Sequence, residues 1–264
     1  MEDMQLVKNL FNVEGKVVLV TGGGGMGTAN ARFFAKNGAK VILASRRIEQ
    51  VTDVKNRLAE EGLAIDVAVI DIAKHESIVA TVAEIAEKYG RIDVLIHTAA
   101  TCHVEPTLTF AENELRETLD SDLLGTIFLN QECGKVMIKG GFGRIINYNS
   151  IDCLSVNATD AMGYAVAKAG VMHATKFMAV ELAPYGITVN GLAPIWINTP
   201  MMAQRPKSYL DAAIAQVPMG RMAEPDDYLG IALYLCSEAG KFMTGQTLLV
   251  DGGWSLTRCF TYDK

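Results

Sequence analysis

Short runs of β-branched and apolar residues alternate along this chain with longer segments of helical periodicity, and this alternation most constrains what it can fold into. Strands are predicted at residues 16–20, 41–44, 66–70, 94–96, 144–148, 188–190 and 247–250. Helices are predicted near residues 25–37, 48–62, 75–89, 112–138, 161–183 and 225–237. Because crossovers between parallel strands are usually helices, the order predicts a doubly wound α/β fold, with helices on both faces of a seven-stranded parallel sheet.

The length of the chain, 264 residues, suits one large α/β domain with a substantial core. Residues 1–12 are predicted to form an N-terminal arm, and residues 13–264 to form the domain. The stretch 199–222 has the least regular pattern of the chain, so we expect it to be a mobile lid.

The acidic balance of the chain argues against some classes of partner. The formal net charge is −6, and binding a polyanion needs a basic surface, so we expect no nucleic-acid partner. No apolar run reaches the roughly 18 residues of a membrane-spanning helix, and the acidic start of the chain is unlike a secretory signal. These features predict a cytoplasmic protein that acts on a small molecule and has no membrane partner.

The cysteines are scattered, without paired spacing and without histidines at metal-ligand spacing. We therefore expect no disulfide framework and no metal site. Most of the cysteines are expected to be small buried apolar residues. They are Cys102, Cys133, Cys153, Cys236 and Cys259.

A run of glycines stands where the first predicted strand passes into the first predicted helix, at residues 21–27. Gly22, Gly24 and Gly27 satisfy the pattern G-x-G-x-x-G. Glycines let the backbone approach a pyrophosphate at the positively polarised N-terminus of a helix. The pattern is weak alone, but its position between a strand and a helix predicts a dinucleotide-binding turn and a Rossmann-like domain. The predicted contacts of this turn are Gly22, Gly24, Gly25 and Met26.

The end of the second predicted strand indicates which dinucleotide binds. A fold specific for NAD places an acidic residue there to bind the ribose hydroxyls, whereas this chain has Ser45 followed by Arg46 and Arg47. A hydroxyl and guanidinium groups can bind a 2′-phosphate through charge-assisted hydrogen bonds, so we predict NADP(H). The alternative is that the two arginines form only a solvated helix start. Further cofactor contacts are expected after the third and fourth strands, at Asp71, Ile72 and Ala99.

Tyr164 and Lys168 stand four residues apart on a predicted helix, so their side chains share one face. A free tyrosine has a pKa of about 10, and we expect the nearby ammonium to lower the pKa of Tyr164 by favouring its phenolate. Tyr164 would exchange a proton with a substrate oxygen as general acid or base, while Lys168 would also hold the nicotinamide ribose. Ser150, at the end of the fifth predicted strand, can hydrogen-bond the same oxygen.

These motifs occur in one order with further segments, and the chain resembles the short-chain dehydrogenase/reductases from about residue 15 to residue 254. The resemblance is carried by residues 21–27, Asp71, 93–96, Ser150, 164–168, 189–194, Thr199 and 244–253. It leans toward the gluconate-dehydrogenase-like and 3-oxoacyl-reductase-like branches. The resemblance implies a homotetramer or dimer, a Ser-Tyr-Lys set that reduces carbonyls or oxidises alcohols, and contacts of Ile197 and Thr199 with the nicotinamide carboxamide.

Three departures from the family pattern bear on the site. The family's glycine turn reads T-G-x-x-x-G-x-G, and here it is one residue shorter. The family's N-N-A-G after the fourth strand reads H-T-A-A, and we interpret His97 as a hydrogen-bonded structural residue rather than a catalytic one. Asp122 stands where relatives carry an asparagine of a water-linked proton relay. As a carboxylate it could still hold water, or raise the pKa of Lys168.

Substrate-facing positions are predicted just beyond strand ends and in the lid. The candidates are Cys102, His103, Asp152, Cys153, Trp196, Met201 and Met202. The methionines and the tryptophan would suit a bulky apolar substrate, whereas Arg205 and Lys207 would suit a sugar acid or an acyl carrier. An ordinary exposed surface explains the two cations equally well.

Two classes of function fit the sequence. The first is an active NADP(H)-dependent oxidoreductase that transfers a hydride between the cofactor and a carbonyl or secondary alcohol. The alternative is a non-catalytic NADP(H)-binding redox sensor or assembly subunit, because this fold does not by itself imply catalysis.

Overall fold

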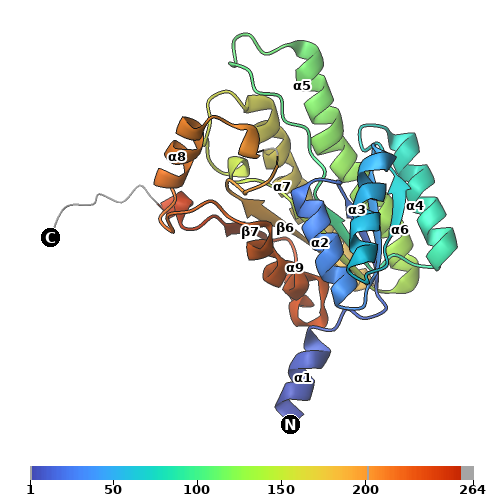
Figure 1. Ribbon diagram of the computed structural model, residues 1–264. Helices are drawn as coiled ribbons and strands as arrows, with labels where there is room; N and C mark the ends of the chain where they lie inside the picture. The colour runs from blue at the N-terminus through green and yellow to red at the C-terminus, as the bar shows by residue number, and fades with distance from the viewer. Residues whose placement is uncertain (1, 201, 257–264) are drawn as a thin grey trace.

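The computed structural model describes residues 2–200 and 202–256, so the predictions made for Met201 and Cys259 lie outside the described residues. Within these residues, seven strands form one sheet in the order β3-β2-β1-β4-β5-β6-β7, and every neighbouring pair is parallel (Figure 1). The strands are β1 (Val17–Thr21), β2 (Lys40–Ser45), β3 (Asp66–Val69), β4 (Val94–His97), β5 (Gly143–Tyr148), β6 (Ile187–Pro194) and β7 (Thr247–Val250). The predicted seven-stranded parallel sheet is confirmed.

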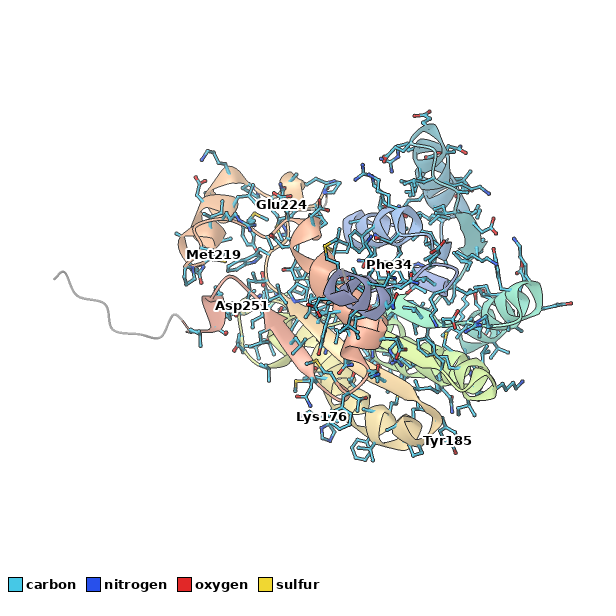
Figure 2. The ribbon with its side chains drawn as sticks, turned by 90° about the horizontal axis from the view of Figure 1, so that it is seen from below. Phe34, Lys176, Tyr185, Met219, Glu224 and Asp251 are labelled. Carbon is cyan, nitrogen blue, oxygen red and sulfur yellow. The ribbon has the colours of Figure 1, made fainter. Side chains whose placement is uncertain are left out.

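Helices cover both faces of this sheet (Figure 1). They are α1 (Glu2–Leu10), α2 (Gly25–Lys36), α3 (Ile48–Glu60), α4 (His75–Tyr89), α5 (Glu112–Thr118), α6 (Thr126–Gly140), α7 (Met162–Leu182), α8 (Lys207–Ala215) and α9 (Leu229–Cys236). Side chains alternate between the faces of a strand, so β1 sends Val18 and Val20 into the core under α2, α3 and α9. Val17 and Leu19 enter the core under α4, α6 and α7. In Figure 2, Phe34 marks the α2 side of the sheet and Lys176 the α7 side.

The strand order places the functional end of the sheet. The chain runs outward from β1 through β2 to β3, then returns to the other side of β1 with β4. Loops at the carboxyl ends of β1 and β4 therefore diverge, and ligands of open parallel sheets bind in the crevice that forms at such a point. Gly22 and Ser150 follow the ends of β1 and β5 on this side of the sheet.

The predicted helix over residues 112–138 is interrupted, contrary to the single periodic segment expected from the sequence. A π-helical turn, Leu119–Gly125, joins α5 to α6. The turn packs against the loop after β3, since a Cβ atom at Gly125 would lie 2.1 Å from the carbonyl oxygen of Ile72. A π turn widens the helix by one residue and is found most often at functional sites.

Two other stretches are more regular than predicted. The segment 199–222 contains α8, and its ends are tied together because Ile197 forms a β-bridge with Ala223. Within the segment expected as an arm, residues 2–10 form α1, which projects away from the layered body in Figure 1. No helix among the described residues is both long and apolar enough to cross a membrane.

Candidate active site

A single cavity of about 1920 Å³ runs from the glycine turn to the segment 199–222. Its volume exceeds the range of roughly 300–1,000 Å³ that is usual for one small ligand, so it has room for a dinucleotide and a substrate together. Most of the predicted site residues line it. These are Gly22, Gly24, Gly25, Met26, Ser45, Arg46, Arg47, Asp71, Ile72, Ala99, Cys102, Ser150, Asp152, Tyr164, Lys168, Trp196, Ile197, Thr199 and Met202.

The glycine turn passes directly into α2, and its backbone is tightly folded. Gly22 has a φ of +103°, a conformation that favours glycine. A Cβ atom at Gly27 would lie 1.7 Å from the carbonyl oxygen of Gly22, so the turn closes on itself only without a side chain there. At Gly24, by contrast, a Cβ atom would meet no other atom within 4 Å. The first N–H groups of a helix have no partner within it, so the N-terminus of α2 offers donors for an anion beside this open space.

Gln50 on α3 connects the glycine turn to the arginine pair. Its side-chain amide donates to the carbonyl oxygen of Gly23 at 2.9 Å, and its Oε1 accepts from Nη2 of Arg47 at 3.2 Å. The Ser45 hydroxyl accepts from the Arg47 amide at 3.1 Å, which fixes the backbone at the end of β2. Arg46 is exposed on the cavity wall. Gln50 is a site residue that sequence reasoning missed, because no motif distinguishes it from a surface glutamine.

Tyr164 and Lys168 project from α7 into the other half of the cavity, with the ammonium 5.3 Å from the centre of the tyrosine ring. Lys168 is almost fully buried, and its ammonium donates to the carbonyl oxygen of Tyr148 at 3.1 Å. Ser150 lies on the same wall at the end of β5. The predicted trio is therefore brought together around one volume.

The pKa of Tyr164 is raised in this structure, which corrects the expectation that Lys168 lowers it. Burial of the phenol is the main cause, and the negative charge of Asp122 adds to it, while a hydrogen bond with Ser150 acts in the opposite direction. Burial also lowers the pKa of Lys168, although Asp122 partly restores it. Desolvation disfavours the charged forms of both side chains. Tyr164 is therefore a neutral phenol rather than a standing phenolate.

Asp122 lies beneath the cavity wall in the π turn and is fully buried. Its Oδ1 accepts from the Thr101 amide at 2.7 Å and from the Ser121 hydroxyl at 2.6 Å. Its Oδ2 has no hydrogen-bond partner and lies 3.9 Å from the ammonium of Lys168. Burial raises the pKa of this carboxyl, and attraction to Lys168 opposes that shift. Asp122 and Lys168 therefore form a buried pair within electrostatic reach of Tyr164.

His97 braces the centre of the sheet, as interpreted from the sequence. The Thr126 hydroxyl donates to the carbonyl oxygen of Asp122 at 2.6 Å, so it must accept from Nε2 of His97, which is 2.9 Å away. Nδ1 then lacks a proton and accepts from the Thr21 hydroxyl at 2.6 Å. Burial lowers the pKa of His97 to about 3, which leaves the ring neutral. The histidine thus connects β1 to the π turn that carries Asp122.

Three predicted site residues do not line the cavity. His103 turns toward Glu117, with Nε2 at 3.2 Å from the carboxylate. Cys153 is buried in the short turn after Ser150, and Asp122 lies behind the cavity wall, where it contacts Thr101, Ser121 and Lys168. Of the two lid cations considered for substrate binding, Lys207 pairs with Asp211 at 2.6 Å, whereas Arg205 lines the cavity. Within residues 2–200 and 202–256, no group of three or more His, Cys, Asp or Glu side chains is placed to hold a metal ion.

Comparison with known proteins agrees with this geometry. A family model described as enoyl-(acyl carrier protein) reductase matches residues 20–255. A 3-oxoacyl-(acyl-carrier-protein) reductase of Thermotoga maritima is 33% identical over 92% of this chain and 99% of its own length. An NAD-dependent glycerol dehydrogenase of Listeria innocua is 34% identical over 93% of this chain and 96% of its own length.

Among solved structures, a gluconate 5-dehydrogenase from Burkholderia cenocepacia in complex with NADP and tartrate superposes with a TM-score of 0.89. It is 32% identical in sequence, and the match covers 95% of this chain and 99% of that one. The family model, the relatives and the similar structure all indicate the same protein family. The chain belongs to the short-chain dehydrogenase/reductase family of oxidoreductases.

Proposed function

We propose that this protein is an NADP(H)-dependent oxidoreductase that transfers a hydride between the cofactor and a carbonyl or secondary alcohol. The observation that carries the proposal is the single cavity that holds the glycine turn and the arginine pair at one end and Ser150, Tyr164 and Lys168 at the other. A paired titration with NADPH and NADH, followed by turnover of ketones and sugar acids with the cofactor that binds, tests it. Tight binding without any turnover would favour a redox sensor or assembly subunit instead.

The residues present fit a dinucleotide with a 2′-phosphate. The open space above Gly24 and the N-terminus of α2 suit a pyrophosphate, and Arg46 and Arg47 offer two guanidinium groups at the end of β2. When bound, the reduced nicotinamide would supply a hydride to the substrate carbon. The residues that would hold the cofactor are Gly22, Gly24, Gly25, Met26, Ser45, Arg46, Arg47, Asp71, Ile72, Ala99, Tyr164, Lys168, Ile197 and Thr199.

The chain's own residues would manage the proton and the developing charge. In reduction, the hydroxyl of Tyr164 donates its proton to the substrate oxygen, and in oxidation the phenolate takes that proton back. Ser150 hydrogen-bonds the same oxygen and stabilises its negative charge. Lys168 stays next to the ring and favours the phenolate once it has formed, and Asp122 opposes part of the effect of burial on the pKa of that lysine.

Replacing Arg46 with alanine should weaken NADPH binding by about 10- to 100-fold and NADH binding far less, because a charge-assisted hydrogen bond to the 2′-phosphate is worth roughly 1.5–3 kcal/mol. Fluorescence titration with both cofactors measures the two affinities. Arg116→Ala is the matched control, since Arg116 pairs with Glu112 on α5. Equal losses for the two cofactors would contradict the phosphate contact. The glycerol dehydrogenase among the relatives is NAD-dependent, which makes this the decisive test of the cofactor.

Replacing Asp122 with asparagine should shift the pH profile of alcohol oxidation to lower pH. Oxidation needs Tyr164 as the phenolate, so its rate rises with pH through the pKa of that tyrosine. The Asp122 charge raises this pKa, and its removal lowers it. Initial rates across the alkaline range measure the midpoint. Asp120→Asn, on the exposed side of the same π turn, should leave the midpoint in place. A midpoint that stays in place would show that Asp122 does not act on Tyr164, and a midpoint that rises would show that Asp122 acts mainly by supporting the charge of Lys168.

A further inference from the structure

The hydroxyl of Ser150 is already engaged by a neighbouring carboxylate. Its oxygen accepts from the Asp152 amide at 3.2 Å, and its proton is donated to Oδ2 of Asp152 at 2.9 Å. Ser150 caps the short 3₁₀ turn Ile151–Cys153, so the two side chains are held close by the local backbone. The Ser150 hydroxyl, which should bind the reacting oxygen, is therefore already hydrogen-bonded to a negatively charged acceptor.

Asp152 faces the volume where the substrate would lie. It lines the cavity, and its charge raises the pKa of both Tyr164 and Cys102, which places it within electrostatic reach of the proton-transfer centre. Its other oxygen lies 3.5 Å from the Asn157 amide, and the Asn157 side chain also donates to this carboxylate. The carboxylate thus has capacity left for a donor that arrives from the cavity.

Substrate binding must rearrange this pair. A serine hydroxyl carries one proton, so Ser150 can donate to the reacting oxygen only after it releases Asp152. A partly buried carboxylate that loses a hydrogen bond costs free energy unless another donor replaces the one that left. A plain ketone has no donor to offer, whereas a hydroxyl on the carbon next to the carbonyl does.

We propose that Asp152 is a substrate-binding residue that accepts a hydrogen bond from a hydroxyl vicinal to the reacting carbon, so that the substrates are α-hydroxy ketones and the corresponding 1,2-diols. The inference rests on the proposed function, because it assigns the substrate class of the same site. The two oxygens of such a substrate are close neighbours, and they would meet Ser150 and Asp152, which are themselves one hydrogen bond apart. Hydride and proton transfer remain with the cofactor and Tyr164.

The test compares ketones that differ only in the vicinal group. Hydroxyacetone carries the donor, methoxyacetone keeps the electron-withdrawing oxygen without a donor, and butanone replaces the hydroxyl with a methyl group. α-Hydroxycyclohexanone and α-methoxycyclohexanone repeat the comparison at larger size. For the wild-type protein with saturating NADPH, we expect kcat/KM for the hydroxy ketone to exceed both comparators by at least about tenfold, which is what one hydrogen bond to a charged group supplies.

The same ratio is then measured in variants. In Asp152→Ala this ratio of kcat/KM values should fall to near one. In Asp152→Asn, which keeps an acceptor without the charge, the ratio should lie between one and the wild-type value. Asp160→Asn is the control, because Asp160 is a second carboxylate on the cavity wall, and its ratio should equal that of the wild type. Thermal unfolding and NADPH affinity show whether each variant is folded, and the ratio within one variant cancels any general loss of activity.

The outcomes separate the two proposals. A wild-type ratio near one, or a high ratio that survives in Asp152→Ala, would overturn the role of Asp152 while the proposed reaction stands. Absence of turnover with every carbonyl compound would overturn the proposed function and this inference with it. A high ratio that collapses only in the Asp152 variants supports both.

Discussion

Tyr164→Phe is expected to lower turnover by about 10³-fold, with a far smaller effect on cofactor affinity. Phenylalanine keeps the ring beside Lys168 and removes only the hydroxyl that gives the proton, and general acid–base catalysis contributes roughly 10²–10⁴-fold. Because burial raises the pKa of this tyrosine, the phenol is protonated at neutral pH and is ready to donate. Single-turnover oxidation of bound NADPH, with the best carbonyl substrate, measures the chemical step directly.

The matched control for this variant is Tyr185→Phe. Tyr185 lies half exposed in the turn after α7, away from the cavity, and its loss should leave turnover as it is (Figure 2). If Tyr164→Phe turns over at the wild-type rate, another group must be the acid. If the wild-type protein itself binds NADPH but reduces no carbonyl compound, the sensor or assembly role becomes the better description.

Gly27→Ala is expected to weaken cofactor binding on the order of 10²-fold and to lower the free energy of unfolding by about 1–3 kcal/mol. The added methyl group would have to occupy a point 1.7 Å from the carbonyl oxygen of Gly22, so the turn must move away from the N-terminus of α2. Cofactor titration and urea unfolding measure the two effects separately.

Gly230→Ala serves as the control for the urea unfolding measurement. Gly230 lies in α9, and a Cβ atom there would meet no other atom within 4 Å. Alanine in a helix is favoured over glycine by about 0.5–1 kcal/mol, so this variant should be slightly more stable and should bind the cofactor as before. Wild-type binding by Gly27→Ala would mean that the shortened glycine turn does not hold the pyrophosphate.

The central strands were predictable because β1, β4 and β5 are short, largely apolar runs buried on both sides, which leaves few alternatives. The strand whose length was most underestimated is β6, which continues through Gly191 to Pro194. These residues are poor strand formers, but pairing with β5 and β7 on either side holds them in the sheet. Tertiary contacts of this kind leave no local trace in the sequence.

The candidate site also contains residues that the sequence could place and features that it could not. Glycines, serine, tyrosine and lysine could be placed because spacing and position after a strand identify them. The direction of the Tyr164 pKa shift could not be predicted from the sequence, because it depends on how much water the folded cavity excludes. Neither the bridge made by Gln50 nor the bond from Ser150 to Asp152 could be foreseen, since both are choices of side-chain rotamer within the packed structure.

The strand order also bears on how the protein folds. β1, β4 and β5 are neighbours in the sheet but lie far apart along the chain, so the cavity exists only after long loops have closed. Closing such loops is slow compared with forming local helices, and a chain with only part of its sheet has no complete place for the cofactor. The dinucleotide would then bind the native chain and not its precursors, and its cellular concentration would add directly to the stability of the folded protein.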